Sequence, residues 1–210
     1  MLDKNGFNEW APGYDKSVSD AEKAERYPFA GYSAVLSEVR GLIKEPRGAE
    51  ILDIGIGTGK FSAGLYAAGA RICGLDFSSA MLEKAKAAMP DGEFHLFDFN
   101  SGLPQELKGR SFDYIISAYA FHHLDDEGKA AFLRSLGGNL KSGGKIILAD
   151  VAFKTTGELA ACRERSGDKW DDAEIYMVAE TLLPLLHNSG LNAEYRQVSS
   201  CAGILILHSI

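Results

Sequence analysis

A glycine-rich turn between a strand and a helix limits most strongly how this chain can fold. The motif DIGIGTG, residues 53–59, follows the apolar run 49–54 and precedes a helical pattern over 60–68. Glycines at such a turn let the backbone bend tightly and let a ligand approach the main chain closely. The turn therefore predicts a parallel α/β sheet with a ligand site at the carboxyl end of its first strand.

Short β-like runs and helical stretches alternate along the rest of the chain, as they do in parallel sheets joined by helices. Helix-breaking residues separate the predicted elements: Gly69 ends the first helix and Pro90 ends the second. The tail 192–210 predicts two strands with a turn near Ser199–Ser200. Further strands are expected at 70–75, 93–98, 112–118 and 145–151, the last introduced by a KSGG turn, and helices at 29–43, 79–89, 126–140 and 178–188, with short helices in 154–178.

Carboxylates stand at successive strand ends. Asp76 ends the second predicted strand, 21 residues after Gly55, where a carboxylate accepts hydrogen bonds from ribose hydroxyls. Asp98 ends the third strand, and Asp53 lies inside the first. Lys60 occupies the position of the third glycine of a dinucleotide-binding turn, so the pattern favours a ligand without a pyrophosphate. The alternative for each acid is a helix cap or a solvated charge.

Five segments together resemble a known family. ILDIGIGTGKFS, CGLDFS, FHLFDFN, FDYIISAYAFHHL and LKSGGKIILADV are similar, in order and spacing, to the motifs of class I S-adenosylmethionine-dependent methyltransferases. The resemblance covers residues 49–151, and WAPGYDKSV and FAGY resemble a narrower group of bacterial small-molecule methyltransferases. It implies a three-layer Rossmann-like α/β fold with a seven-stranded sheet in the order 3-2-1-4-5-7-6, strand 7 antiparallel.

The same resemblance implies S-adenosylmethionine as the cofactor and assigns residues to it. The glycines of the turn would cradle the methionine part, Asp76 would hold the ribose, and Ala118 would line the amino-acid end. Aromatic and acidic residues after the second and third strands would contact the adenine, and an N-terminal tyrosine would contact the cofactor directly. The expected cofactor set is Gly55, Gly57, Gly59, Asp76, Phe77, Asp98, Phe99, Ala118 and Tyr14.

Methyl transfer from a sulfonium needs alignment and exclusion of water, with a general base only for a protonated nucleophile. Candidate bases are His122 and His123, which follow the fourth strand. Tyr14, His122 and Asp150 are candidates for contact with the acceptor. The alternatives are that one histidine packs and the other is solvated, and that Asp150 caps a loop.

The charge balance indicates a small acceptor. The chain has 22 Lys and Arg against 29 Asp and Glu, a net charge of −7, and no basic run that would favour nucleic acid. The segment SAYAFHHL also lacks the Pro-Pro-aromatic motif of many nucleic-acid amino-methyltransferases. No apolar run reaches the roughly 18–20 residues of a membrane span. We expect a cytoplasmic monomer or homodimer without a metal, whose three cysteines are buried thiols.

Two other functions remain open at this point: a cofactor-binding protein without turnover, and an NAD-dependent oxidoreductase. Both are compatible with a glycine-rich turn alone.

We expect one domain, with an N-terminal helical lid at 1–48, the cofactor-binding core at 49–151, and a substrate-side cap with the final strands at 152–210. The lid prediction depends on residues 7–32, which are rich in aromatic side chains and poor in aliphatic ones. Such rings attract a sulfonium. The alternative is that they pack a helix onto the sheet. The aromatic residues are Phe7, Trp10, Tyr14, Tyr27, Phe29 and Tyr32.

Overall fold

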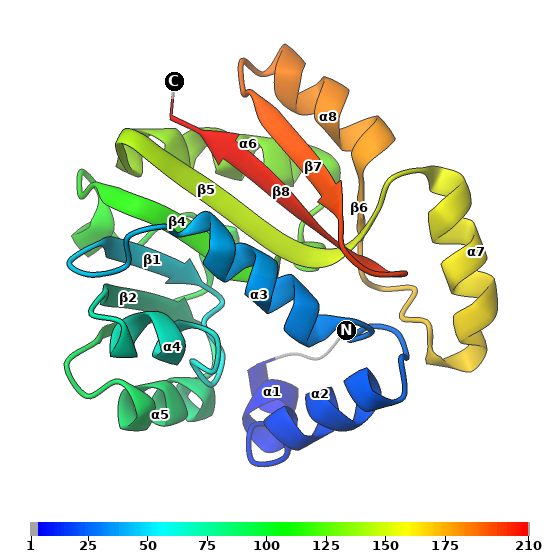
Figure 1. Ribbon diagram of the computed structural model, residues 1–210, viewed down its shortest axis with the longest axis horizontal. Coiled ribbons are helices and arrows are strands. Elements are labelled where there is room, and N and C mark those ends of the chain that lie inside the picture. The colour runs from blue at the N-terminus through cyan, green and yellow to red at the C-terminus, as the bar shows by residue number, and fades with distance from the viewer. Residues whose placement is uncertain (1–3, 210) are drawn as a thin grey trace.

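A twisted mixed sheet runs through the centre of the molecule (Figure 1). The computed structural model describes residues 4–209, apart from the side chains of residues 4, 5 and 7. Strands follow the order β3-β2-β1-β4-β5-β8-β7, with β8 antiparallel to both neighbours. This confirms the predicted order 3-2-1-4-5-7-6, because β7 and β8 correspond to the predicted strands 6 and 7. The strands are β1 (Glu50–Ile54), β2 (Arg71–Asp76), β3 (Glu93–Leu96), β4 (Phe112–Ala118), β5 (Leu140–Phe153), β7 (Ala193–Gln197) and β8 (Ala202–His208).

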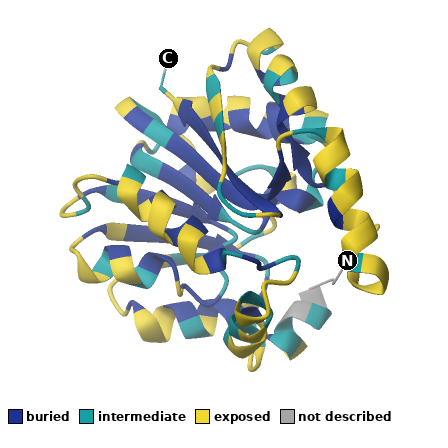
Figure 2. Ribbon diagram, turned by 45° about the vertical axis from the view of Figure 1, so that its right-hand side comes forward, coloured by how far each residue is buried: buried dark blue, intermediate teal, exposed yellow. Residues whose placement is uncertain are grey.

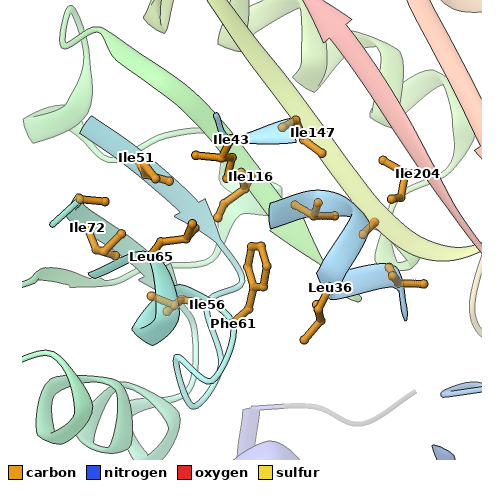
Figure 3. Close-up of a cluster of buried hydrophobic side chains, with 14 of the residues drawn as sticks. Leu36, Ile43, Ile51, Ile56, Phe61, Leu65, Ile72, Ile116, Ile147 and Ile204 are labelled. Atoms are coloured by element: carbon orange, nitrogen blue, oxygen red, sulfur yellow. The ribbon is translucent and has the colours of Figure 1, made fainter. Parts of the chain in front are cut away.

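Helices cover both faces of this sheet. Side chains of α3, α4 and α5 pack on one face, and those of α6 and α8 on the other. Alternate residues of one strand enter different clusters, as Ile51 and Leu52 of β1 do, which is the period-2 pattern of a doubly covered sheet. Figure 3 shows the first cluster between α3 and the sheet. The helices are α3 (Tyr32–Leu42), α4 (Ser62–Ala67), α5 (Ser79–Ala88), α6 (Asp126–Leu136), α7 (Thr156–Ser166) and α8 (Ala179–Asn188).

Several predicted boundaries were wrong. The helix expected over 126–140 ends at Leu136, where two glycines follow in a 3-10 turn, Gly137–Asn139. The expected KSGG turn lies within β5, where the register with β4 shifts between Phe112 and Tyr114. A two-residue strand, β6 (Met177–Val178), pairs with the end of β5 and was not predicted. These features depend on neighbours across the sheet, which a local pattern does not contain.

The N-terminal residues form two further helices in front of the sheet edge, α1 (Lys4–Trp10) and α2 (Tyr14–Lys23) (Figure 1). The helix expected at 29–43 begins at Tyr32, and its apolar face is buried (Figure 2). Phe29 and Tyr32 are each 8% exposed in the main core cluster, so these two rings do pack α3 onto the sheet. The Phe7 side chain lies outside the described residues.

No helix within residues 4–209 is long and apolar enough to cross a membrane. Cys73, Cys162 and Cys201 are buried free thiols, as the sequence predicted. Burial raises the pKa of the Cys73 thiol to about 12, so this group stays protonated near neutral pH. The cytoplasmic location stays a prediction.

Candidate active site

The glycine turn after β1 uses its glycines for two different purposes. Gly55, Gly57 and Gly59 have φ angles of 72°, 57° and 75°, a region that favours glycine. A Cβ on Gly55 would lie 2.5 Å from the Ala120 Cβ, and one on Gly59 would lie 2.7 Å from the Met89 Cε. A Cβ on Gly57 would meet no described atom within 4 Å. Gly55 and Gly59 are therefore required by packing, and the space beside Gly57 is open to a ligand.

Asp76 joins this turn to the start of α5. Its Oδ2 accepts a hydrogen bond from the Gly57 backbone N–H at 2.8 Å, and its Oδ1 accepts one from the Ser78 N–H at 2.8 Å. Burial raises the pKa of Asp76, although the backbone donors oppose that shift. The carboxylate is thus held at the carboxyl end of β2 beside Gly57.

A cleft of about 420 Å³, its open mouth included, lies over the carboxyl ends of β1, β2 and β4. It brings together seven of the nine expected cofactor residues, while Gly59 and Asp98 do not line it. Asp98 is exposed and caps the 3-10 turn Phe99–Ser101 by accepting a hydrogen bond from the Asn100 N–H. The lining residues are Tyr14, Gly55, Gly57, Asp76, Phe77, Met81, Phe99, Ala118, Tyr119, Ala120 and His123.

Asp53 is buried beneath the turn rather than in the cleft. Its Oδ2 accepts a 2.5 Å hydrogen bond from the Ser62 hydroxyl of α4. Burial raises the pKa of Asp53 to about 7, the Ser62 hydrogen bond opposes this, and the nearby Asp76 adds to it. The Asp53 carboxyl therefore lies beneath the cleft, near enough to Asp76 in its lining for the two groups to interact.

The two histidines after β4 differ in surroundings. They belong to the 3-10 turn Phe121–His123, labelled η3. The His122 Nδ1 lies 2.8 Å from the Asp150 Oδ1, and its Nε2 lies 3.6 Å from a Glu174 oxygen. Burial alone would lower the pKa of His122, but these two carboxylates raise it above its usual value. Neither His122 nor Asp150 lines the cleft.

His123 does line the cleft. Burial and, to a smaller extent, the neighbouring His122 lower its pKa to about 4, so His123 is neutral at pH 7. The histidine able to meet a ligand is thus His123, while His122 and Asp150 fix the loop behind it. Asp150 also accepts hydrogen bonds from the Phe121 and Val151 N–H groups, at 2.8 and 2.7 Å.

The helices α1 and α2 lie beside the cleft and are held to the rest of the chain by a few polar contacts. The Asn8 Oδ1 accepts from the Ser78 hydroxyl at 2.7 Å, and the Ala11 carbonyl accepts from the Lys84 Nζ at 2.5 Å. Asp15 accepts from the Thr58 hydroxyl at 3.0 Å. Tyr14 lines the cleft, its ring in edge contact with Trp10 at 4.8 Å and with Phe29 at 6.4 Å. An aromatic wall therefore stands over the strand ends.

Comparisons with known proteins decide the family. A sequence profile described as a methyltransferase domain matches residues 51–144. The chain is 34% identical over 212 residues to an uncharacterized methyltransferase of Geobacillus thermodenitrificans, which covers 95% of this chain and 93% of that relative. A second, from Anoxybacillus flavithermus, is 37% identical over 152 residues, or 70% of this chain and 66% of the relative. The chain belongs to the class I S-adenosylmethionine-dependent methyltransferases.

Solved structures agree on the fold of this methyltransferase. A complex of DhpI with SAH superimposes with a TM-score of 0.71 at 21% identity, over 96% of this chain and 92% of the other. A methyltransferase bound to the Haloferax volcanii Trm112 activator gives a TM-score of 0.69 at 18% identity, over 98% and 96% of the two chains. At these identities the likeness concerns the fold.

The methyltransferase has a site residue that sequence reasoning missed. Tyr119 follows β4 with a φ of 57°, a conformation that costs a non-glycine residue on the order of 1–2 kcal/mol. Its ring lines the cleft, and its hydroxyl is buried without a hydrogen-bond partner among the described residues. Its place beside Ala118 was the available signal, but no sequence pattern indicates a strained backbone there.

One group of metal-ligating side chains occurs in residues 4–209 of the methyltransferase: Cys73, Glu93 and His95 on β2 and β3. The Arg110 guanidinium donates to both Glu93 oxygens, at 2.8 and 2.7 Å, and His95 lies 2.7 Å from the same carboxylate. A cation would compete with Arg110 for this carboxylate. The group lies away from the cleft, and we assign it no catalytic part.

Proposed function

We propose that this methyltransferase binds S-adenosylmethionine in the cleft over β1, β2 and β4 and transfers its methyl group to a small-molecule acceptor. The observation that carries the proposal is the junction of Asp76 with Gly57. A buried carboxylate there adjoins a glycine whose missing side chain leaves room for a ligand. This combination fits a ribose held beside a main chain that the ligand approaches closely.

The cofactor residues follow from their places along the cleft. Asp76 would accept hydrogen bonds from the ribose hydroxyls, because its oxygens retain acceptor capacity beyond the backbone donors Gly57, Ser78 and Phe77. Phe77 and Phe99 would flank the adenine, and Gly55 and Ala118 would adjoin the methionine end. Asp98, which is exposed, would reach only the outer edge of the adenine.

When bound, the cofactor supplies an activated methyl group on a positively charged sulfur. The acceptor would take this methyl group by in-line displacement, with S-adenosylhomocysteine as the leaving group. The chain contributes alignment and a dry site, which α1, α2 and the ring of Tyr14 supply by covering the strand ends. Rings such as Tyr14 also attract the sulfonium, by about 0.5–2 kcal/mol.

We assign His123 the role of orienting the acceptor by accepting a hydrogen bond from it. It lines the cleft, and its pKa of about 4 leaves it neutral at pH 7 but too weakly basic to be an efficient proton acceptor. His122 would act as a positioning residue, because Asp150 and Glu174 hold its ring behind the cleft. A His123→Gln variant should lose turnover more than cofactor affinity, and His122→Gln should lose stability as well.

A small acceptor is supported by the net charge of −7, which disfavours polyanionic nucleic acid. The test is transfer of a labelled methyl group from S-adenosylmethionine to metabolites of a cell extract, read by mass spectrometry. The proposal predicts labelled products of low molecular mass and stoichiometric S-adenosylhomocysteine. Binding of the cofactor without any labelled product would favour a protein that binds without turnover.

A further inference from the structure

A second depression opens on the same side of the sheet as the cleft, beyond β5. It measures about 840 Å³ with its open mouth included. The loop after α2, the carboxyl end of α7 and the turn between β7 and β8 form its walls. Figure 1 shows that end of α7 facing the connection between α2 and α3. Segments far apart in the sequence therefore build this hollow.

The depression is basic. Arg26, Arg165 and Lys169 line it, against one acid, Glu25. None of the three cations has an ion pair with a residue in the described part of the chain. By contrast, Arg163, on the same helix α7 as Arg165, pairs with an aspartate at 2.7 Å. The carboxyl end of α7 accounts for Arg165 in its last turn. Arg26 follows the carboxyl end of α2, so the depression gathers cations from two helix ends in a chain of charge −7.

Hydroxyl groups accompany these cations. Ser166 and Ser200 line the depression from α7 and from the β7–β8 turn. Hydroxyl donors beside unpaired guanidinium and ammonium groups form the donor set that phosphate and carboxylate groups prefer. The chemistry of the wall therefore selects an anion.

The floor of the depression adjoins the wall of the cleft. Cys201, 1% exposed, lines the depression and belongs to a buried cluster against which Tyr119 packs. Tyr119 lines the cleft on its other side. Its hydroxyl is the one buried side-chain polar atom without a hydrogen-bond partner in the part of the chain that the structure describes. The Tyr119 hydroxyl, in the wall between the two hollows, is thus a hydrogen-bond donor without a partner among the described residues.

We propose that the basic depression binds the anionic group, a phosphate or a carboxylate, of the methyl acceptor. The reacting end of that acceptor would reach the cleft by displacing the side chain of Tyr119, whose hydroxyl is buried in the wall and would then donate a hydrogen bond to it. This inference rests on the proposed function and adds the charge class of the acceptor to it.

The first test uses inorganic phosphate and succinate as probes in NMR titrations at constant ionic strength. The amides of Gly167 and Ser200 should shift on titration of the wild-type chain. Arg26→Gln/Lys169→Gln should bind the better anion at least tenfold more weakly, because it loses two charge-assisted contacts. Lys154→Gln/Arg163→Gln removes the same charge from nearby exposed positions and should leave the affinity within twofold. Phosphate binding tighter than succinate indicates a phosphorylated acceptor, and the reverse order a carboxylic acid.

The second test links the depression to transfer. The better anion should inhibit labelling of extract metabolites with the midpoint seen by NMR, and Tyr119→Phe should lower turnover with unchanged affinity for S-adenosylhomocysteine. Absent shifts, equal affinity of the two double variants, or full turnover at saturating anion would each overturn the inference. Affinity for S-adenosylhomocysteine, measured separately on every variant, reports on the proposed function itself. If the wild-type chain does not bind S-adenosylhomocysteine, the proposed function is wrong, whatever the anion titrations give.

Discussion

Removing the charge of Asp76 should weaken cofactor binding through the ribose and should also disturb the glycine turn, because the amide NH2 of an asparagine would face the backbone N–H of Gly57 or Ser78. Asp76 accepts hydrogen bonds from the backbone of Gly57, Ser78 and Phe77 and keeps acceptor capacity for a ribose hydroxyl. A hydrogen bond to a charged group contributes about 1.5–3 kcal/mol, which corresponds to a loss of roughly 10- to 150-fold in affinity. The perturbation is Asp76→Asn, which keeps the shape of the side chain.

The assay is calorimetric titration at pH 8, an alkaline pH chosen because burial raises the pKa of Asp76. Each protein is titrated with S-adenosylhomocysteine and with its 2′-deoxy and 3′-deoxy analogues. At least one analogue should bind the wild-type chain about tenfold more weakly, by the loss of a charged hydrogen bond. In Asp76→Asn that discrimination should shrink to within about twofold, since the partner is gone.

Melting temperatures of both proteins provide the control, because Asp76 also ties the Gly57 turn to the start of α5. A folded variant that discriminates between the analogues as the wild-type chain does would refute the placement of the ribose on Asp76. So would a wild-type chain that binds all three ligands equally.

Three further outcomes follow from the same geometry. Gly57→Ala should weaken S-adenosylhomocysteine binding more than Asp98→Ala does, and weaker binding by Asp98→Ala than by Gly57→Ala would place the ligand elsewhere. Gly59→Ala should instead lower the melting temperature, because its Cβ would meet Met89 at 2.7 Å. The pKa of Asp53 is raised from 3.8 to about 7, so the folded chain holds an extra proton in that window and loses stability as pH rises through it. Asp53→Asn should therefore gain melting temperature relative to wild type between about pH 5 and 8, and a constant difference would contradict the shift. Amides of α1 and α2 should gain protection from hydrogen exchange when S-adenosylhomocysteine binds, whereas unchanged exchange there would show a permanently packed element.

Local backbone requirements made part of the site predictable. The glycine turn and the acid at the end of β2 are specified by short stretches, since a tight turn and a strand end need particular residues at fixed spacing. The alternation of strands and helices predicted a parallel sheet, and the order of its strands came from the family resemblance. Seven of the nine expected cofactor residues line one cleft for this reason.

Tertiary contacts decided what the sequence left open. Gly57 and Gly59 look alike in the motif, but Met89 and Ala85 crowd only Gly59. His122 and His123 are neighbours, and only the contact of His122 with Asp150, 28 residues away, separates their roles. Such pairings need the folded sheet, so the sequence could name these residues without ranking them.

The burial of individual aromatic residues in the N-terminal segment could not be predicted from the sequence either. The aromatic stretch was expected to form one lid, yet Phe29 and Tyr32 belong to the core, while Trp10 and Tyr14 lie only partly buried above the cleft. The lid is therefore confined, as a proposal, to α1, α2 and the residues that join them. Composition alone does not distinguish a ring that packs from a ring that covers a ligand.

Calorimetric titration of the wild-type chain with S-adenosylmethionine, S-adenosylhomocysteine and NAD tests the central claim most directly. The account predicts that both sulfur compounds bind once per chain, that they compete with each other, and that NAD gives no heat of binding. Binding of NAD in place of the two sulfur compounds would contradict it, because the cleft beside Gly57 and Asp76 would then serve a dinucleotide.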